Sequence, residues 1–414
     1  MKQRLRALTR LVAVALALHA APAWAGELTF WTWRQEDRAA YAQLFKAFTD
    51  ANPGITVKFE AFPNEQYQTV VSTALAGGKG ADVLHTRAYG GLEQLARAGY
   101  LRPLDGDVPE LAGFPPAALA STSLRADKRV YSVPFASQTL GLFINRDVFA
   151  RAGAQPPETW EEFLALCRAL KAKTITPLAN GTQSPFMTEV LTSTVTNPFL
   201  GPEFVADIRA GRATFEDRRY VAALGRLLEL REFLPQGYSS VDYPTMQQLF
   251  VSGRAAMFLG GSFEIANFRK QNPRINMDFI APPAPEAGAP RPVSLFYDGG
   301  YAINARSPNQ ADALALIRFM STKQFGDRFT ELLGNLSPIP GVEVKDELLA
   351  RVAALNAVSL PYLMAVDFRY DSPTGSELLQ NAVQRMMSGN ATPAQVGADV
   401  TAGIARNFPP FQRK

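Results

Sequence analysis

The first hundred residues alternate between short apolar segments and amphipathic ones. Residues 28–33 (LTFWTW) and 81–84 have the aromatic and β-branched composition of buried strands, and residues 55–60 (ITVKFE) alternate as a half-buried strand does. Segments with apolar residues at helical spacing follow these strands, at 38–50, 66–76 and 92–98. This β-α-β-α-β-α order predicts a parallel sheet covered by helices.

A second set of elements begins near residue 140. Thr159 and Glu162 form the pattern of a capping box in front of an apolar helical run, and helical periodicity recurs over 203–234. Residues 255–259 are typical of a buried strand that ends in two glycines. The proline-rich stretch 281–292 predicts a connection rather than a regular element. The pattern therefore predicts two α/β blocks, at about 26–136 and 140–295, followed by a mainly helical part.

The first 25 residues have the three parts of a secretory signal peptide. They hold four basic residues and no acid, then an apolar run at 11–18 and the small-x-small sequence Ala23-Trp24-Ala25. The run is much shorter than the ~20 residues that span a bilayer. We expect cleavage after residue 25 and a periplasmic protein. Gly26 rather than cysteine follows the cleavage site, so no lipid anchor is expected there.

This segment also changes the meaning of the charge. The 414 residues carry 42 basic and 38 acidic side chains, a net charge of +4 that could suggest a nucleic-acid partner. Without the first 25 residues, 38 charges of each sign remain, so we expect no nucleic-acid partner. A single cysteine, Cys167, excludes an intramolecular disulfide and a CxxC motif. After residue 25 the chain has one histidine, His85, and no further cysteine, so it has no cluster of thiol and imidazole ligands. We therefore expect no metal and no cofactor.

An enzyme is an alternative function class. No GxSxG motif surrounds a serine, and residues 77–80 (GGKG) lack the spacing of a phosphate-binding loop. A glycosidase needs only two carboxylates, which Glu36 and Asp298 could supply, but any cleft with two acids meets that condition. We therefore expect a protein that binds without catalysis. A structural envelope protein would leave the aromatic and polar residues at successive strand ends unexplained.

Seven segments, taken in their order and spacing, resemble a known family. They are LTFWTW with NPGITVKFE (28–60), ADVLHT with AGYLRPLD (81–105), YSVPFASQTLGLFINRDVF (131–149), PPETWEEFLALCRAL (156–170), FVSGRAAMFLGGSFEI (250–265), DGGYAINARSPNQADALALIRFM (298–320) and GNLSPIPG (334–341). Together they resemble the extracellular solute-binding proteins of ABC importers, in particular the group-1, maltose-binding-like sugar receptors. The resemblance covers nearly all of the chain after residue 25.

The resemblance implies a class II-like periplasmic binding protein fold, in which two α/β lobes are joined by hinge strands and ligand binds in the cleft between them. It places the first lobe at 26–136 plus 298–355, and the second at 140–295 plus part of 356–414. It implies a monomeric receptor that delivers a mono- or short oligosaccharide to ABC transporter permease subunits. If Arg34 and Arg87 both face the cleft, an acidic ligand such as a uronate or a glycerophosphate is the alternative.

Candidate ligand contacts lie where strands end, because ligands bind outside the carboxyl ends of parallel strands. Aromatic faces suit sugar rings, and charged or amide groups suit paired hydroxyls. The candidates are Trp33, Arg34, Glu36, Thr86, Arg87, Gln138, Phe186, Gly261, Ser262, Phe263, Tyr297, Asp298, Gly300 and Arg369. Four have a second interpretation: Glu36 as a helix cap, Gln138 as a hinge residue, Phe186 as a core residue and Asp298 as a turn residue.

Overall fold

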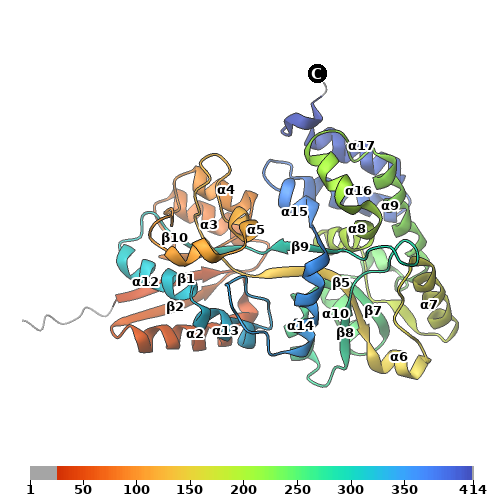
Figure 1. Ribbon diagram of the computed structural model, residues 1–414, viewed down its shortest axis with the longest axis horizontal. Helices are drawn as coiled ribbons and strands as arrows, with labels where there is room; N and C mark the ends of the chain where they lie inside the picture. The colour runs from red at the N-terminus through yellow and green to blue at the C-terminus, as the bar shows by residue number, and fades with distance from the viewer. Residues whose placement is uncertain (1–25, 413–414) are drawn as a thin grey trace, which may run out of the picture.

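The computed structural model of the chain describes residues 26–412. The predicted signal peptide lies outside the described residues. Two sheets, each with its own helices, lie side by side, and strands β5 (Ser137–Asn145) and β9 (Val293–Tyr297) of the second sheet extend toward the first (Figure 1). Within residues 26–412, no helix is both long and apolar enough to span a membrane.

The first sheet has the strand order β2-β1-β3-β10-β4. Its strands are β1 (Gly26–Thr32), β2 (Ile55–Ala61), β3 (Val83–Thr86), β4 (Val133–Pro134) and β10 (Gly300–Ile303). The predicted parallel pairing is confirmed for β1 with β2 and for β1 with β3. β10 returns from more than two hundred residues later and pairs antiparallel with β3.

The helices of the first lobe bury the residues that the helical spacing selected. They are α2 (Arg38–Ala51), α3 (Tyr67–Ala76), α4 (Gly90–Arg97), α5 (Pro116–Ser121), α12 (Gln310–Met320) and α13 (Lys323–Leu333), with the short 3-10 helices η1 (Gln35–Asp37) and η2 (Pro109–Gly113). On α2, for example, Tyr41, Leu44, Phe45 and Phe48 are buried against the sheet. The hydroxyl groups of Tyr41 and Tyr301 form a buried hydrogen bond of 2.6 Å between α2 and β10.

The second sheet has the order β11-β9-β5-β7-β6, with β8 paired to β5. Besides β5 and β9, its strands are β6 (Thr176–Leu178), β7 (Ala255–Gly261), β8 (Met277–Ile280) and β11 (Ser359–Pro361). β5 is buried along its whole length and pairs antiparallel with β7, β8 and β9. It therefore forms the centre of this sheet.

Many helices surround the second sheet. They are α6 (Arg146–Ala152), α7 (Trp160–Ala172), α8 (Pro185–Arg209), α9 (Arg218–Glu229), α10 (Tyr243–Val251), α11 (Glu264–Gln271), α14 (Glu347–Leu355), α15 (Leu363–Asp367), α16 (Gly375–Met387) and α17 (Pro393–Ile404), with η3 (Arg231–Phe233), η4 (Tyr238–Ser240), η5 (Asn356–Val358) and η6 (Pro409–Phe411). The predicted capping box of Thr159 and Glu162 is present at α7. The periodicity over 203–234 corresponds to two helices, α8 and α9, and α8 is itself kinked at Gly201.

The chain passes between the sheets at residues 135–136 and again at 298–299. Helix α14 packs against β8 of the second sheet, and Asp346 before it accepts a hydrogen bond of 2.8 Å from Arg269 of α11. The sequence-based extension of the first lobe to residue 355 stays a prediction, and from these contacts we propose that 347–355 belongs with the second lobe. α16 and α17 pack on α8 and α9, so we place them there too.

Candidate functional site

The indole ring of Trp33 lies between two other side chains just after β1. The imidazole of His85 stacks on one face with ring centroids 3.9 Å apart, and the guanidinium of Arg87 lies 3.8 Å from the ring centroid. Tyr67 packs at 5.4 Å, and Trp33 is only 6 % exposed. Protein groups thus enclose the ring, and the expectation that Trp33 contacts ligand stays a prediction that this packing does not favour.

Arg87 has an unusual environment for a cation. Its guanidinium donates a hydrogen bond of 3.1 Å to the carbonyl oxygen of Asn64, and no carboxylate of the described chain lies within 4 Å. Burial lowers the pKa of Arg87 to about 10; Asp298 opposes this effect, and the charges of Arg369 and Arg34 add to it. Arg87 is therefore a charged donor without an anionic partner of its own.

His85 is fully buried beneath this group. Its Nδ1 atom lies 2.9 Å from the Thr32 hydroxyl, while its Nε2 atom has no hydrogen-bond partner in the described chain. Burial holds the pKa of His85 well below its usual value, so the ring is neutral. Gly299 has a φ of 91°, and a Cβ atom there would lie 2.3 Å from the Thr86 carbonyl oxygen. Glycine at 299 thus allows the link between β9 and β10 to approach this cluster.

Arg34 is neutralised within its own lobe. It forms ion pairs with Asp37 and, at 3.4 Å, with Glu36. The Arg34 side chain is buried, whereas that of Glu36 is half exposed. Asp37 was not among the candidates. An acidic residue is common at the start of a helix, because the helix dipole favours negative charge there, so its presence does not indicate a site. Arg34 is therefore already paired with two acids of its own lobe.

Asp298 lies at the return crossing between the lobes. Its backbone N–H donates to the carbonyl oxygen of Ala136 at 3.0 Å, while its carboxylate has no cation within 4 Å in the described chain. Its charge nevertheless favours the charged forms of Arg34, Arg87 and Arg369. The charge of Asp298 thus acts at a distance on three arginines from the two lobes, without an ion pair or hydrogen bond to any of them in the described chain.

Two phenylalanines of the second lobe form an aromatic surface. Phe186 is the second residue of α8, and Phe263 directly precedes α11. Their ring centroids are 5.9 Å apart, and Phe186 is 36 % exposed, which is rare for a large apolar side chain in this molecule. Of the aromatic candidates, this pair is the one with a face open to a ligand.

Several other candidates are engaged in hydrogen bonds and packing within the protein. Gln138 accepts a hydrogen bond of 2.9 Å from Ser262 and donates one of 3.0 Å to Asn335, so its hinge interpretation fits the structure. The Thr86 hydroxyl donates to the Gly300 carbonyl oxygen at 3.1 Å inside the first sheet. A Cβ atom at Gly261 would collide with the Phe263 ring. All of these candidates are buried and in contact with other protein groups: Thr86, Gln138, Gly261, Ser262 and Gly300.

Arg369 and Tyr297 have protein partners as well. Arg369 donates to Ser376 at 2.8 Å and pairs with the buried carboxylate of Glu189 at 3.2 Å. The backbone N–H of Tyr297 donates to the hydroxyl of Tyr89 at 3.1 Å. Both therefore lie where the second lobe meets the first.

The sequence did not point to Glu264. This carboxyl is fully buried at the start of α11, where it accepts hydrogen bonds from the Tyr243 hydroxyl at 2.6 Å and from Gln247 at 2.9 Å. Burial raises the pKa of Glu264 from 4.5 to about 7, against the effect of both hydrogen bonds and of Arg34. In the sequence, Glu264 looks like an ordinary acidic residue at the start of a helix. Only its hydrogen bonds from Tyr243 and Gln247 of α10 show that it is a buried carboxyl.

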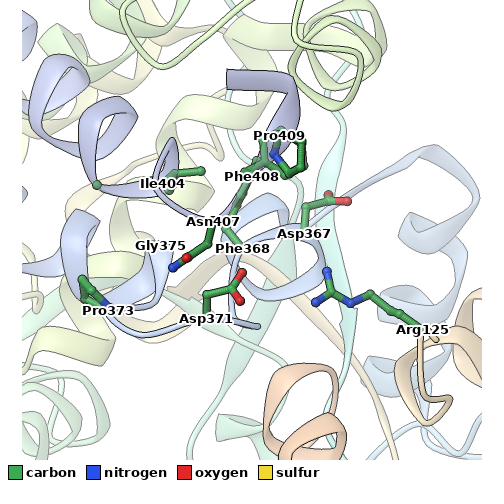
Figure 2. Close-up of a pocket in the computed structure, with 11 residues that line it drawn as sticks. Arg125, Asp367, Phe368, Asp371, Pro373, Gly375, Ile404, Asn407, Phe408 and Pro409 are labelled. Atoms are coloured by element: carbon green, nitrogen blue, oxygen red, sulfur yellow. The ribbon is translucent and has the colours of Figure 1, made fainter. Parts of the chain in front are cut away.

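The hollow shown in Figure 2 lies elsewhere. Its volume is about 210 Å³, and it is lined by Arg125 and by residues between Asp367 and Pro409. A second hollow of about 190 Å³ lies between α11 and α13. No residue that lines either hollow is a candidate ligand contact, although Phe368, the neighbour of Arg369, lines the first hollow. We therefore base the site on the strand ends and their contacts.

Fold and geometry define the class as a two-lobed α/β binding protein with hinge strands. The model of the bacterial extracellular solute-binding protein family matches residues 32–326. The chain belongs to this family.

The relatives are distant, and the matches cover between 42 % and 100 % of their length. The multiple sugar-binding protein of Streptococcus mutans is 22 % identical over 325 residues, 76 % of each chain, and the lactose-binding protein of Rhizobium radiobacter is 27 % identical over 180 residues, 41 % of this chain and 42 % of that one. A solved chitin oligosaccharide binding protein superimposes with a TM-score of 0.79 at 21 % identity, covering 92 % of this chain and 99 % of that chain. RafE in complex with raffinose gives 0.74 at 19 % identity, covering 94 % and 100 %. At these identities the structures establish the fold alone.

Proposed function

We propose that the protein is the periplasmic receptor of an ABC importer for a neutral sugar, a mono- or short oligosaccharide. The observation that carries the proposal is an open aromatic surface on one lobe, Phe186 with Phe263, together with two charged groups that have no ion-pair partner within 4 Å in the described chain. These groups are Arg87 of the first lobe, which donates only to Asn64, and Asp298 at the hinge. The sugar-binding names of the relatives support the same ligand class.

This combination suits the chemistry of a sugar. A pyranose presents a C–H-rich face that packs on aromatic rings, while its hydroxyl groups both donate and accept hydrogen bonds at the edge. Phe186 and Phe263 offer the first kind of contact. Arg87 can only donate and Asp298 can only accept, so together they match a pair of hydroxyl groups.

The balance of charge favours a neutral ligand over the acidic alternative. Arg34 is already paired with Asp37 and Glu36, and Arg369 with Glu189. Only Arg87 remains for an anion, and the charge of Asp298 acts on it. A uronate or a sugar phosphate would therefore bring its charge near the carboxylate of Asp298, and repulsion between the two negative charges costs binding energy.

The mechanism follows from the position of these groups. A ligand that contacts both lobes binds the closed arrangement more tightly than the open one, and it shifts the equilibrium by that difference in affinity. The closed form would then be presented to the permease. We infer binding without catalysis, because the chain belongs to a family of solute-binding proteins. After cleavage of residues 1–25, the protein would act as a periplasmic monomer without a lipid anchor.

A thermal-shift screen of the mature protein tests the ligand class. The compounds are neutral mono- and oligosaccharides, including lactose, raffinose and chitotriose, together with uronates and sugar phosphates. At a concentration near 100 times Kd, a ligand adds roughly 2.7 kcal/mol to the free energy of unfolding and raises Tm by several degrees. Neutral sugars should raise Tm. A rise with anionic compounds alone would replace the neutral sugar with the acidic alternative.

A further inference from the structure

The start of helix α4 in the first lobe is in close contact with the second lobe. A Cβ atom at Gly90 would lie 1.7 Å from the carbonyl oxygen of Arg369 and 2.7 Å from the Cα atom of Tyr370. These distances are far shorter than any non-bonded contact, so the two backbones touch because residue 90 has no side chain. Gly90 itself is buried.

Side chains on both sides extend this contact. The guanidinium of Arg125, in the first lobe, lies 3.5 Å from the centroid of the Tyr370 ring, in the range of a cation–π interaction. Arg125 is held in place by an ion pair of 2.8 Å with the buried carboxylate of Glu93 on α4. In Figure 2 the Arg125 side chain extends from its own lobe toward the chain that carries Asp367 and Asp371.

Tyr89, the residue before Gly90, makes further contacts with the second lobe. Its backbone has φ 55° and ψ −121°, a strained conformation for a residue with a side chain. Its ring is buried among residues of the second lobe's core, 6.5 Å from the Tyr370 ring, and its hydroxyl accepts from the backbone N–H of Tyr297. Strain of this kind persists only where surrounding contacts compensate for it.

The contact is continuous with the proposed ligand site. Arg87 lies three residues before Gly90, and Arg369 lies directly before Tyr370. Arg369 is fixed to the second lobe through Glu189 and Ser376. A movement that separates the lobes would separate Gly90 from Tyr370 and would also move Arg87 away from Arg369.

We propose that the start of α4 (Tyr89 and Gly90, supported by Arg125) and the segment Arg369–Tyr370 form a latch that closes when ligand draws the lobes together. The proposal rests on the proposed function, because it takes ligand binding to be coupled to closure. It goes further by naming the contact that stabilises the closed arrangement outside the ligand site. Gly90 is then required for closure rather than for folding.

Gly90→Ala is the direct test, with Gly225→Ala as its matched control. A Cβ atom at Gly225, on helix α9, would have no atom within 4 Å. The measurements are Tm without sugar, Kd for the neutral sugar with the largest thermal shift on the wild type, and the radius of gyration by small-angle X-ray scattering with and without that sugar. The latch predicts that Gly90→Ala keeps the Tm of the wild type, loses at least tenfold in affinity and no longer becomes more compact with sugar. Gly225→Ala should match the wild type in affinity and compaction.

Other outcomes separate this proposal from the proposed function. If Gly90→Ala lowers the sugar-free Tm by many degrees, the contact is a permanent part of the fold and the latch is refuted. If the variant binds sugar and compacts as the wild type does, the latch is likewise refuted. If no sugar binds even the wild type, the sugar assignment fails, and the sugar-free Tm of Gly90→Ala still decides whether the contact is permanent. Tyr370→Ala, which removes the ring without adding a collision, should weaken binding severalfold under the latch and leave it unchanged otherwise.

Discussion

Glutamine in place of Glu264 should change how the stability of the protein depends on pH. The carboxyl is fully buried, its partners are the neutral groups of Tyr243 and Gln247, and no cation lies within 4 Å of it in the described chain. Burial raises the pKa of Glu264 from 4.5 to about 7. The folded state therefore holds this proton more tightly than the unfolded chain does.

The sign and the size follow from this difference. The stabilisation is fully present below about pH 4.5 and is lost as the pH rises through about 7. A shift of this size corresponds to about 3 kcal/mol at roughly 1.4 kcal/mol per pKa unit. Glutamine can keep both hydrogen bonds, because its amide donates to the Tyr243 hydroxyl and its carbonyl accepts from Gln247. At pH 8, Glu264→Gln should thus be more stable than the wild type, and Tm should be higher by several degrees.

The assay is chemical denaturation of both proteins from pH 5 to pH 8, with the difference in free energy of unfolding plotted against pH. Glu331→Gln is the control, because Glu331 is exposed on α13 and its loss removes the same charge without burial. The difference between Glu264→Gln and the wild type should grow with pH, and that for Glu331→Gln should stay flat. Parallel curves for all three proteins would refute the assignment of a buried, proton-holding carboxyl.

Four other substitutions test the roles of single residues in stability and in sugar binding. Trp33→Ala should cost about 3–5 kcal/mol of stability in a denaturation experiment, because the ring packs between His85 and Arg87; a loss below 1 kcal/mol would show that the ring is not part of the core. Asp82→Asn should cost about 1.5–3 kcal/mol at pH 7, because the carboxylate accepts from Thr29 and Ser307 at 2.8 and 2.6 Å; hydrogen bonds outweigh burial and lower its pKa, so the difference should shrink as the pH falls below 4. Phe186→Ala should weaken sugar binding about three- to tenfold with an unchanged Tm, whereas Phe263→Ala should lower both affinity and Tm because its ring also packs on the core; equal Tm losses for the two variants would contradict this division.

Local periodicity predicted much of the fold because the relevant information is local. The apolar positions of α2, the capping box at Thr159 and the strands β1, β2 and β3 each depend on residues a few positions apart. The packing of helix α14 on β8 could not be predicted in this way, because β8 is about seventy residues away in the sequence. No periodicity within the helix carries that information.

The candidate site was harder to predict for the same reason. Trp33 has the residue type and position of a sugar platform, but its ring is enclosed by His85 and Arg87, which arrive from the third strand. Glu264 looks like an ordinary first-turn acid until Tyr243 of α10 is placed against it. Strand ends could thus be found from the sequence, whereas the choice between an open face and a packed one depends on contacts between distant segments.

The most direct test of the central claim is the Kd of the best neutral sugar measured by isothermal titration calorimetry on three proteins. These are the wild type, Arg87→Gln in the first lobe and Phe186→Ala in the second. If one sugar lies between the lobes, both variants should bind it more weakly, with losses of about 10–100-fold for the charged donor and about three- to tenfold for the aromatic ring. Unchanged affinity in either variant would mean that the sugar contacts only one lobe at these groups, and would contradict the account of a ligand held by both.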